Sequence, residues 1–169
     1  MRPVFDPVSL LATLNDHGVR YVVMGGFAAV AYGSPLPTVD VDITPERSRE
    51  NLERLSSALD DLEARIRVEG VPEGLAFDHD AAGLGRVSIL NLTTRLGELD
   101  LVMTPSGDAG YPELASRAVV VELHDVSVPI ASLDDVIASK EVADRMKDRA
   151  ALPILRALRD RLEGGAGGP

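Results

Sequence analysis

Residues 21–43 read YVVMGGFAAVAYGSPLPTVDVDI. The apolar run at the start of this segment meets two glycines, Gly25 and Gly26, and a second β-type run near its end carries Asp40 and Asp42. Alternate residues of a strand share one face, so these two carboxylates are expected to point the same way. The segment therefore predicts a strand, a short helix and a second strand with paired carboxylates.

Both features of this segment point to phosphate and metal chemistry. Glycines between a strand and a helix let backbone N–H groups approach a phosphate without an intervening Cβ atom. Mg²⁺ takes oxygen ligands, usually one or two carboxylates together with substrate phosphates. One short segment thus offers a phosphate cradle and half of a metal site.

A third carboxylate, Asp100, lies in the apolar strand-like run at residues 97–103. A lone Asp in such a run is costly unless it is paired or binds a metal. Together with Asp40 and Asp42 it can hold one or two Mg²⁺ ions, and paired ions stabilise the attacking and leaving oxygens of an in-line displacement. Nucleotidyl transfer from a nucleoside triphosphate is a reaction of this kind.

This set of motifs resembles the DNA polymerase β-like nucleotidyltransferase superfamily. Its minimal signature is an apolar residue with Gly-Gly or Gly-Ser, then Asp-x-Asp, then a later Asp, and it matches Met24-Gly25-Gly26, Asp40-Val41-Asp42 and Asp100. The resemblance implies an α/β (α+β) fold with a mixed central sheet, flanking helices and C-terminal helices. It also implies a nucleoside triphosphate as substrate.

A C-terminal motif narrows the resemblance. The stretch at residues 131–148, with Lys140, Arg145 and Lys147-Asp148, is similar to that of AbiEii-type nucleotidyltransferase toxins and their bacterial relatives. The resemblance implies that Lys140 contacts the nucleotide phosphates, that Asp148 orients the basic cluster, and that Arg145 and Lys147 are further phosphate contacts.

The same resemblance gives roles to the upstream motifs. Gly25 and Gly26 would bind the triphosphate, Asp40 and Asp42 would be metal ligands, and Asp100 would complete the metal site and help deprotonate the attacking hydroxyl. One departure stands out, because relatives often carry an arginine where this chain has Leu36.

Composition limits the remaining possibilities. The 169 residues predict one domain over residues 1–163 and a flexible tail over residues 164–169. The chain has no cysteine, which excludes disulfides and thiolate metal sites, and no run approaches the roughly 20 apolar residues of a membrane span. A cytoplasmic location is expected. The net charge of −10 disfavours non-specific nucleic-acid binding, although residues 140–161 are locally basic.

Periodicity and breaker residues place these motifs on elements. Residues 70–85 are predicted to be loop-rich, and the remaining predictions are helices at residues 6–17, 27–32, from 45 or 46 to about 65, 111–117, 132–145 and 147–162, and strands at residues 19–24, 39–44, 86–92, 97–103, 119–123 and 126–130. Pro153 within the last helix predicts a later start or a kink.

Three functions follow from these observations. The first is a Mg²⁺-dependent nucleotidyltransferase, the toxin of a toxin–antitoxin pair, which transfers a nucleotide to a tRNA or protein hydroxyl. The second is a small-molecule adenylyltransferase, because an acidic protein suits a cationic acceptor such as an aminoglycoside. The third is a non-catalytic nucleotide-binding module, motivated by Leu36.

Overall fold

The computed structural model describes residues 4–105 and 109–165. Within them the elements in chain order are α1 (Pro7–Asp16), β1 (Tyr21–Met24), α2 (Gly25–Ala31), β2 (Asp40–Pro45), α3 (Arg49–Asp61), β3 (Arg65–Val68), β4 (Val71–Leu75), α4 (Ala81–Leu84), β5 (Ile89–Thr94), β6 (Gly97–Val102), α5 (Tyr111–Arg117), β7 (Val119–Leu123), β8 (Val126–Ile130), α6 (Leu133–Ala143) and α7 (Met146–Gly165).

All eight strands of the described residues form one mixed sheet, in the order β4-β3-β5-β6-β2-β1-β8-β7. The pairs β2–β6 and β1–β8 are parallel, and the other neighbouring strands are antiparallel. The strands that carry the two sequence motifs, β2 and β6, are direct neighbours at the centre of the sheet. This confirms the predicted α/β class with a mixed central sheet.

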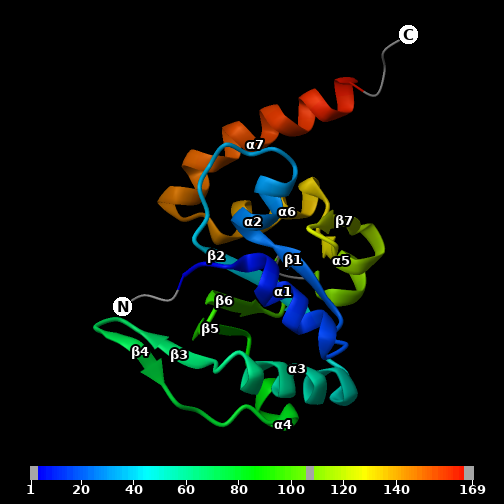
Figure 1. The fold of residues 1–169 in the computed structure, drawn as a ribbon. Coiled ribbons are helices and arrows are strands. Elements are labelled where there is room, and N and C mark those ends of the chain that lie inside the picture. The colour runs from blue at the N-terminus through cyan, green and yellow to red at the C-terminus, as the bar shows by residue number, and fades with distance from the viewer. Residues whose placement is uncertain (1–3, 106–108, 166–169) are drawn as a thin grey trace.

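The helices gather in two groups around this sheet. Figure 1 shows α2, α6 and α7 together at the top of the molecule, and α3 and α4 at the bottom beside the β3–β4 hairpin. One face of α3 packs into the core, because Leu52, Leu55 and Leu59 are all buried. No helix among the described residues is both long and apolar enough to cross a membrane.

Two helices begin at residues other than the predicted ones. α3 begins at Arg49, not at residue 45 or 46, because the side chain of Ser48 accepts the backbone N–H of Asn51 and caps the helix. α2 begins at Gly25 itself, two residues before the predicted start, so both glycines belong to its first turn.

The largest correction concerns the region after α3. Residues 65–75 form the β3–β4 hairpin, and α4 follows, where the sequence predicts the end of a helix and a long loop. Gly70 turns the hairpin with a φ of +81°. The hairpin adds two strands to one edge of the sheet and places the basic strand β3 beside β5.

The C-terminal helix is continuous through Pro153. It ends at Gly165, so the first two residues of the predicted tail are helical, and residues 166–169 lie outside the described residues. The predicted segments at residues 111–117, 119–123 and 126–130 are confirmed at both ends as α5, β7 and β8.

Candidate active site

The first part of the site is the turn from β1 into α2. Gly25 has a φ of +65°, a conformation that other residues rarely adopt. A Cβ atom at this position would lie 1.9 Å from Oδ2 of Asp42. A Cβ atom on Gly26 would lie 3.1 Å from Oγ1 of Thr38. Glycine at position 25 therefore allows the backbone of α2 to approach the carboxylate on β2.

Strand register brings four carboxylates onto one face of the sheet. In the parallel β2–β6 pair, Asp40 lies opposite Glu98, and Asp42 lies opposite Asp100. Directly paired residues of neighbouring strands share a face, as do alternate residues of one strand. Glu98-Leu99-Asp100 thus repeats on β6 the acidic spacing of β2, and Glu98 is a site residue that sequence reasoning missed.

Asp42 is the most perturbed carboxylate of this group. Burial raises the pKa of Asp42 to about 7, the charges of Asp40 and Asp100 contribute to the rise, and Lys147 and Lys140 oppose it. Within the described residues neither Asp40 nor Asp42 forms a side-chain hydrogen bond or ion pair. A half-buried pair of carboxylates without a bonded partner favours the binding of a cation.

Asp100 differs from the carboxylates of β2 because it has an arginine partner. Arg67 of β3 donates from Nη2 to Oδ1 of Asp100 at 2.8 Å and from Nη1 to Oε2 of Glu98 at 2.7 Å. Burial raises the pKa of Asp100, Arg67 opposes the shift, and Asp40 adds to it. Arg67 falls just after the predicted end of a helix, and the alternation Arg65-Ile66-Arg67-Val68 is the signal in the sequence for a strand.

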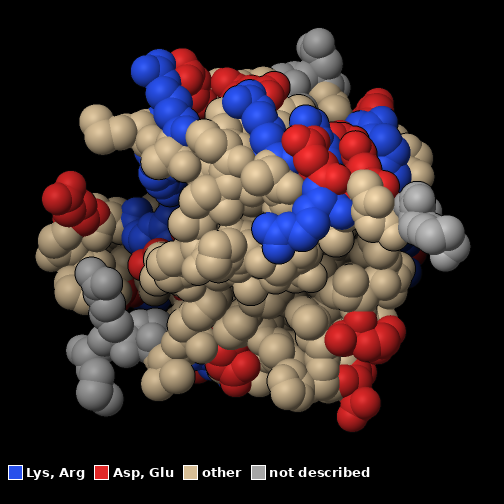
Figure 2. Space-filling view, turned by 90° about the horizontal axis from the view of Figure 1, so that it is seen from above, with Lys and Arg blue, Asp and Glu red and all other residues tan. Residues whose placement is uncertain are grey.

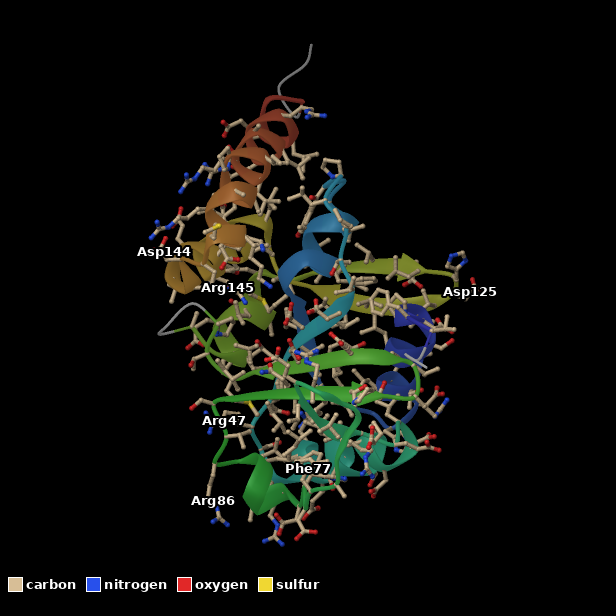
Figure 3. The ribbon with its side chains drawn as sticks, turned by 90° about the vertical axis from the view of Figure 1, so that its left-hand side faces the viewer. Arg47, Phe77, Arg86, Asp125, Asp144 and Arg145 are labelled. Atoms are coloured by element: carbon tan, nitrogen blue, oxygen red, sulfur yellow. The ribbon has the colours of Figure 1, made fainter. Side chains whose placement is uncertain are left out.

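The basic part of the site lies at the junction of α6 and α7. Asp148 is fully buried and accepts hydrogen bonds from the backbone N–H of Arg145 at 3.1 Å and from its Nε at 2.6 Å. The Nζ of Lys140 lies 3.5 Å from Oδ1 of the same carboxylate. Burial acts to raise the pKa of Asp148, but the hydrogen bonds from Arg145 outweigh it and the pKa is lowered. Figure 3 labels Arg145 at this junction, beside Asp144.

A single cavity of about 800 Å³ joins the acidic and basic parts. Of the nine residues singled out from the sequence, eight line it: Gly25, Gly26, Asp40, Asp42, Asp100, Lys140, Arg145 and Lys147. The ninth, Asp148, lies buried behind the basic side chains that it holds. Leu36, which replaces the arginine of relatives, also lines the cavity and packs against the core.

The oxygen donors of β2 suit a magnesium ion. Asp40 and Asp42 supply the carboxylates that Mg²⁺ uses together with substrate phosphates, and both residues line the cavity beside Gly25 and Gly26. Over residues 4–105 and 109–165, no three His, Asp or Glu side chains form a ready-made metal cluster. Asp100, the third carboxylate predicted as a metal ligand, is bonded to Arg67 in this structure.

Comparisons with known proteins show which solved structures have a similar fold. No protein-family model matches the chain, and no curated protein matches its sequence. The structure is similar to a lincosamide antibiotic adenylyltransferase, LnuA, in a lincomycin-bound crystal structure. The TM-score is 0.60 at 15% identity, over 93% of this chain and 99% of that chain.

Two further solved structures have a similar fold. ANT(2'')-Ia, in complex with adenylyl-2''-tobramycin, has a TM-score of 0.53 at 15% identity, over 95% of this chain and 99% of that chain. An antigenic nucleotidyltransferase-like protein from Paracoccidioides brasiliensis has a TM-score of 0.54 at 17% identity, over 92% of this chain and 78% of that chain. The chain therefore has the nucleotidyltransferase fold, as its strand motifs predicted.

Proposed function

We propose that this protein is an enzyme that transfers a nucleotidyl group from a nucleoside triphosphate to a hydroxyl acceptor. The observation that carries the proposal is the contact between Gly25 and Asp42, which joins a helix N-terminus to a carboxylate pair inside one cavity. A basic cluster lines the same cavity. These are the groups that a triphosphate with its divalent cation requires.

Each group of residues has a distinct part in this scheme. The backbone N–H groups of Gly25 and Gly26 would bind phosphate oxygens, and Asp40 and Asp42 would hold Mg²⁺, which would supply positive charge beside the transferred phosphate. Lys140, with Arg145 and Lys147, offsets the remaining phosphate charge from the other side.

Two carboxylates act without contacting the triphosphate. Asp148 is a positioning residue, because it is buried and fixes Lys140 and Arg145. Asp100 accepts the proton of the attacking hydroxyl, and burial makes it a stronger base by raising its pKa.

We propose a small hydroxyl compound as the acceptor. The cavity wall includes four exposed apolar side chains, Val39, Ile89, Val142 and Ile154, which suit the carbon skeleton of a small molecule. Two of the structural neighbours hold an antibiotic or its adenylylated form. An aminoglycoside-like cation would also be attracted by the net charge of −10.

Ion pairing in the C-terminal helices supports a small acceptor over a nucleic acid. Arg149 pairs with Asp144, Arg156 with Glu141, and Arg159 with Asp134. In the view from above, Figure 2 shows blue and red side chains interleaved on this face, between large uncharged areas. On the face seen in Figure 2, acidic side chains therefore interrupt the locally basic run, in contrast to the continuous basic surface that binds a phosphate backbone.

A toxin that modifies a tRNA end or a protein hydroxyl is the second candidate. It is supported by the arrangement of Lys140, Arg145 and Asp148, which fall in the motif that resembles AbiEii-type toxins and lie together in space. Such a toxin would have an antitoxin partner. A non-catalytic nucleotide-binding module is the third candidate, supported by Leu36 in the cavity wall. All three would act in the cytoplasm, where nucleoside triphosphates are abundant.

One experiment separates these candidates. The protein is incubated with Mg²⁺ and each α-³²P-labelled nucleoside triphosphate, in parallel with an aminoglycoside and lincosamide panel, with tRNA, and with cell protein. We expect label on a small molecule with the wild type and none with Asp42→Asn. Label on tRNA or protein would select the toxin, and binding of nucleotide without any labelled product would select the module.

A further inference from the structure

Arg67 contacts the acidic face of the sheet, although it does not lie on β2 or β6, the two strands that carry the four carboxylates. It lies on β3, two strands away from β6, because β5 lies between them. Its guanidinium crosses β5 and donates to Glu98 and Asp100, from two different nitrogens at 2.7 and 2.8 Å. The side chain of Arg67 is 29% exposed and that of Asp100 is 13% exposed, so this contact is largely shielded from solvent.

Positive charge reaches the carboxylates from two opposite sides. Asp42 feels Lys147 and Lys140 of the C-terminal helices, whereas Asp100 feels Arg67. Asp40 and Asp42 have no bonded cation within the described residues, in contrast to the other two carboxylates of the acidic face. The four carboxylates therefore divide into an arginine-bound pair on β6 and an open pair on β2.

We propose that Arg67 is a resident cation of the site, which takes the place of a second metal ion. The site then binds one divalent ion per nucleotide, held by Asp40 and Asp42, and Asp100 stays bound to Arg67. This inference deepens the proposed function and rests on its metal site. It assigns Arg67 as a positioning residue that acts through Asp100.

The chemistry of the guanidinium supports this assignment. Arginine keeps its charge at all physiological pH values, and its planar fork donates to two carboxylates at once. A metal ion at Oδ1 of Asp100 would have to displace a charge-assisted hydrogen bond from Arg67, and bonds of this kind are among the strongest in proteins. Of the two carboxylate oxygens of Asp100, Arg67 bonds only Oδ1 within the described residues, which leaves Oδ2 to accept the proton of a hydroxyl acceptor.

The test counts metal ions and does not depend on turnover. The protein is brought to equilibrium by dialysis against Mn²⁺ and an α,β-methylene nucleoside triphosphate, which cannot be cleaved at the transferred phosphate. Bound Mn²⁺ and bound nucleotide are then measured per chain. We expect one Mn²⁺ per bound nucleotide for the wild type and two for Arg67→Gln, a twofold rise. The matched control is Arg65→Gln, which changes an exposed arginine of the same strand that contacts the carbonyl of Gly74 and no carboxylate. It should retain one Mn²⁺.

Each outcome has a separate meaning. Two Mn²⁺ ions in the wild type, or an unchanged ratio of one in Arg67→Gln, would overturn the resident cation and leave the proposed function intact. A wild type that binds neither Mn²⁺ nor the nucleotide would instead overturn the proposed function, and this inference with it. Thermal unfolding checks that Arg67→Gln is folded, and if it is not, the wild-type ratio of one or two decides by itself.

Discussion

A Cβ atom placed on Gly25 would lie 1.9 Å from Oδ2 of Asp42, closer than any side chain could approach this carboxylate. The strand-to-helix turn and the acidic face of the sheet are therefore built against each other. Because Met24 lies opposite Asp42 in the β1–β2 pair, the register of the two strands maintains this contact. A phosphate bound at the turn would meet the carboxylate pair directly.

This contact predicts the effect of Gly25→Ala. A methyl group here meets both an unfavourable φ and the Asp42 carboxylate, so we expect a loss of about 3 kcal/mol of unfolding free energy and no detectable nucleotide binding. Gly70→Ala is the control, because Gly70 has a φ of +81° and no atom within 4 Å of its added Cβ. It should cost only about 1 kcal/mol. Urea denaturation measures both, and equal losses would contradict the importance of the Asp42 contact.

Burial of Asp42 predicts a pH-dependent stability in metal-free buffer. Its pKa is about 7 in the folded protein, against 3.8 for an unperturbed aspartate, so the folded state holds the proton more tightly than the unfolded chain does. The resulting stabilisation is complete below pH 3.8 and is lost as the pH rises through 7. Between about pH 5 and pH 8 the free energy of unfolding of the wild type should fall by about 2 kcal/mol or more. That of Asp42→Asn should not show this fall. Parallel stability curves for the two proteins would contradict the raised pKa of Asp42.

The buried carboxylate behind the basic cluster predicts a loss of nucleotide affinity. Asp148→Asn removes the charge that holds Lys140 and Arg145, so we expect affinity for a non-hydrolysable triphosphate to fall about tenfold and stability to fall by about 2 kcal/mol. Asp144→Asn is the control, since this exposed carboxylate pairs with Arg149 outside the cavity. Isothermal titration calorimetry should show an unchanged affinity for the control. An equal loss of nucleotide affinity in both variants would show that the overall charge of the helices causes the loss, and not the position of Asp148.

The apolar cavity wall predicts a separation of acceptor binding from nucleotide binding. Ile89 is 62% exposed and lines the cavity, and Val120 is 63% exposed on the edge strand β7. Ile89→Ser should raise the KM for a small hydroxyl acceptor several-fold and leave the nucleotide KM unchanged, whereas Val120→Ser should change neither. Steady-state kinetics with each substrate varied in turn gives both values. If Ile89→Ser changed only the nucleotide KM, Ile89 would contact the nucleotide and not the acceptor, which would contradict the prediction.

Much of the fold follows from local sequence pattern. The β7–β8 hairpin is predicted at both ends because valine-rich strands flank His124 and Asp125, which both take positive φ at the turn. The central strands β2 and β6 are recognisable in the sequence because apolar residues alternate with acidic residues along both of them. The eight predicted site residues that line the cavity are recognisable from these two strands, the two glycines and the C-terminal motif.

The missing parts depend on tertiary contacts. β4 reads VPEGL, and Pro and Gly are both uncommon in strands, so only its pairing with β3 identifies it. Without this hairpin the role of Arg67 is invisible, because its carboxylate partners lie 31 and 33 residues away in the chain. Glu98 is missed for the same reason, since only the parallel register places it opposite Asp40.

We propose that the reaction in the cavity transfers the nucleotidyl part of a nucleoside triphosphate. The most direct measurement compares nucleoside triphosphates labelled on the α-phosphate and on the γ-phosphate, each incubated with Mg²⁺, the protein and an acceptor panel. We expect label from the α-phosphate, and none from the γ-phosphate, to become attached to an acceptor, and we expect Asp42→Asn to abolish this transfer. Attachment of the γ-label, or transfer that survives Asp42→Asn, would contradict the proposal.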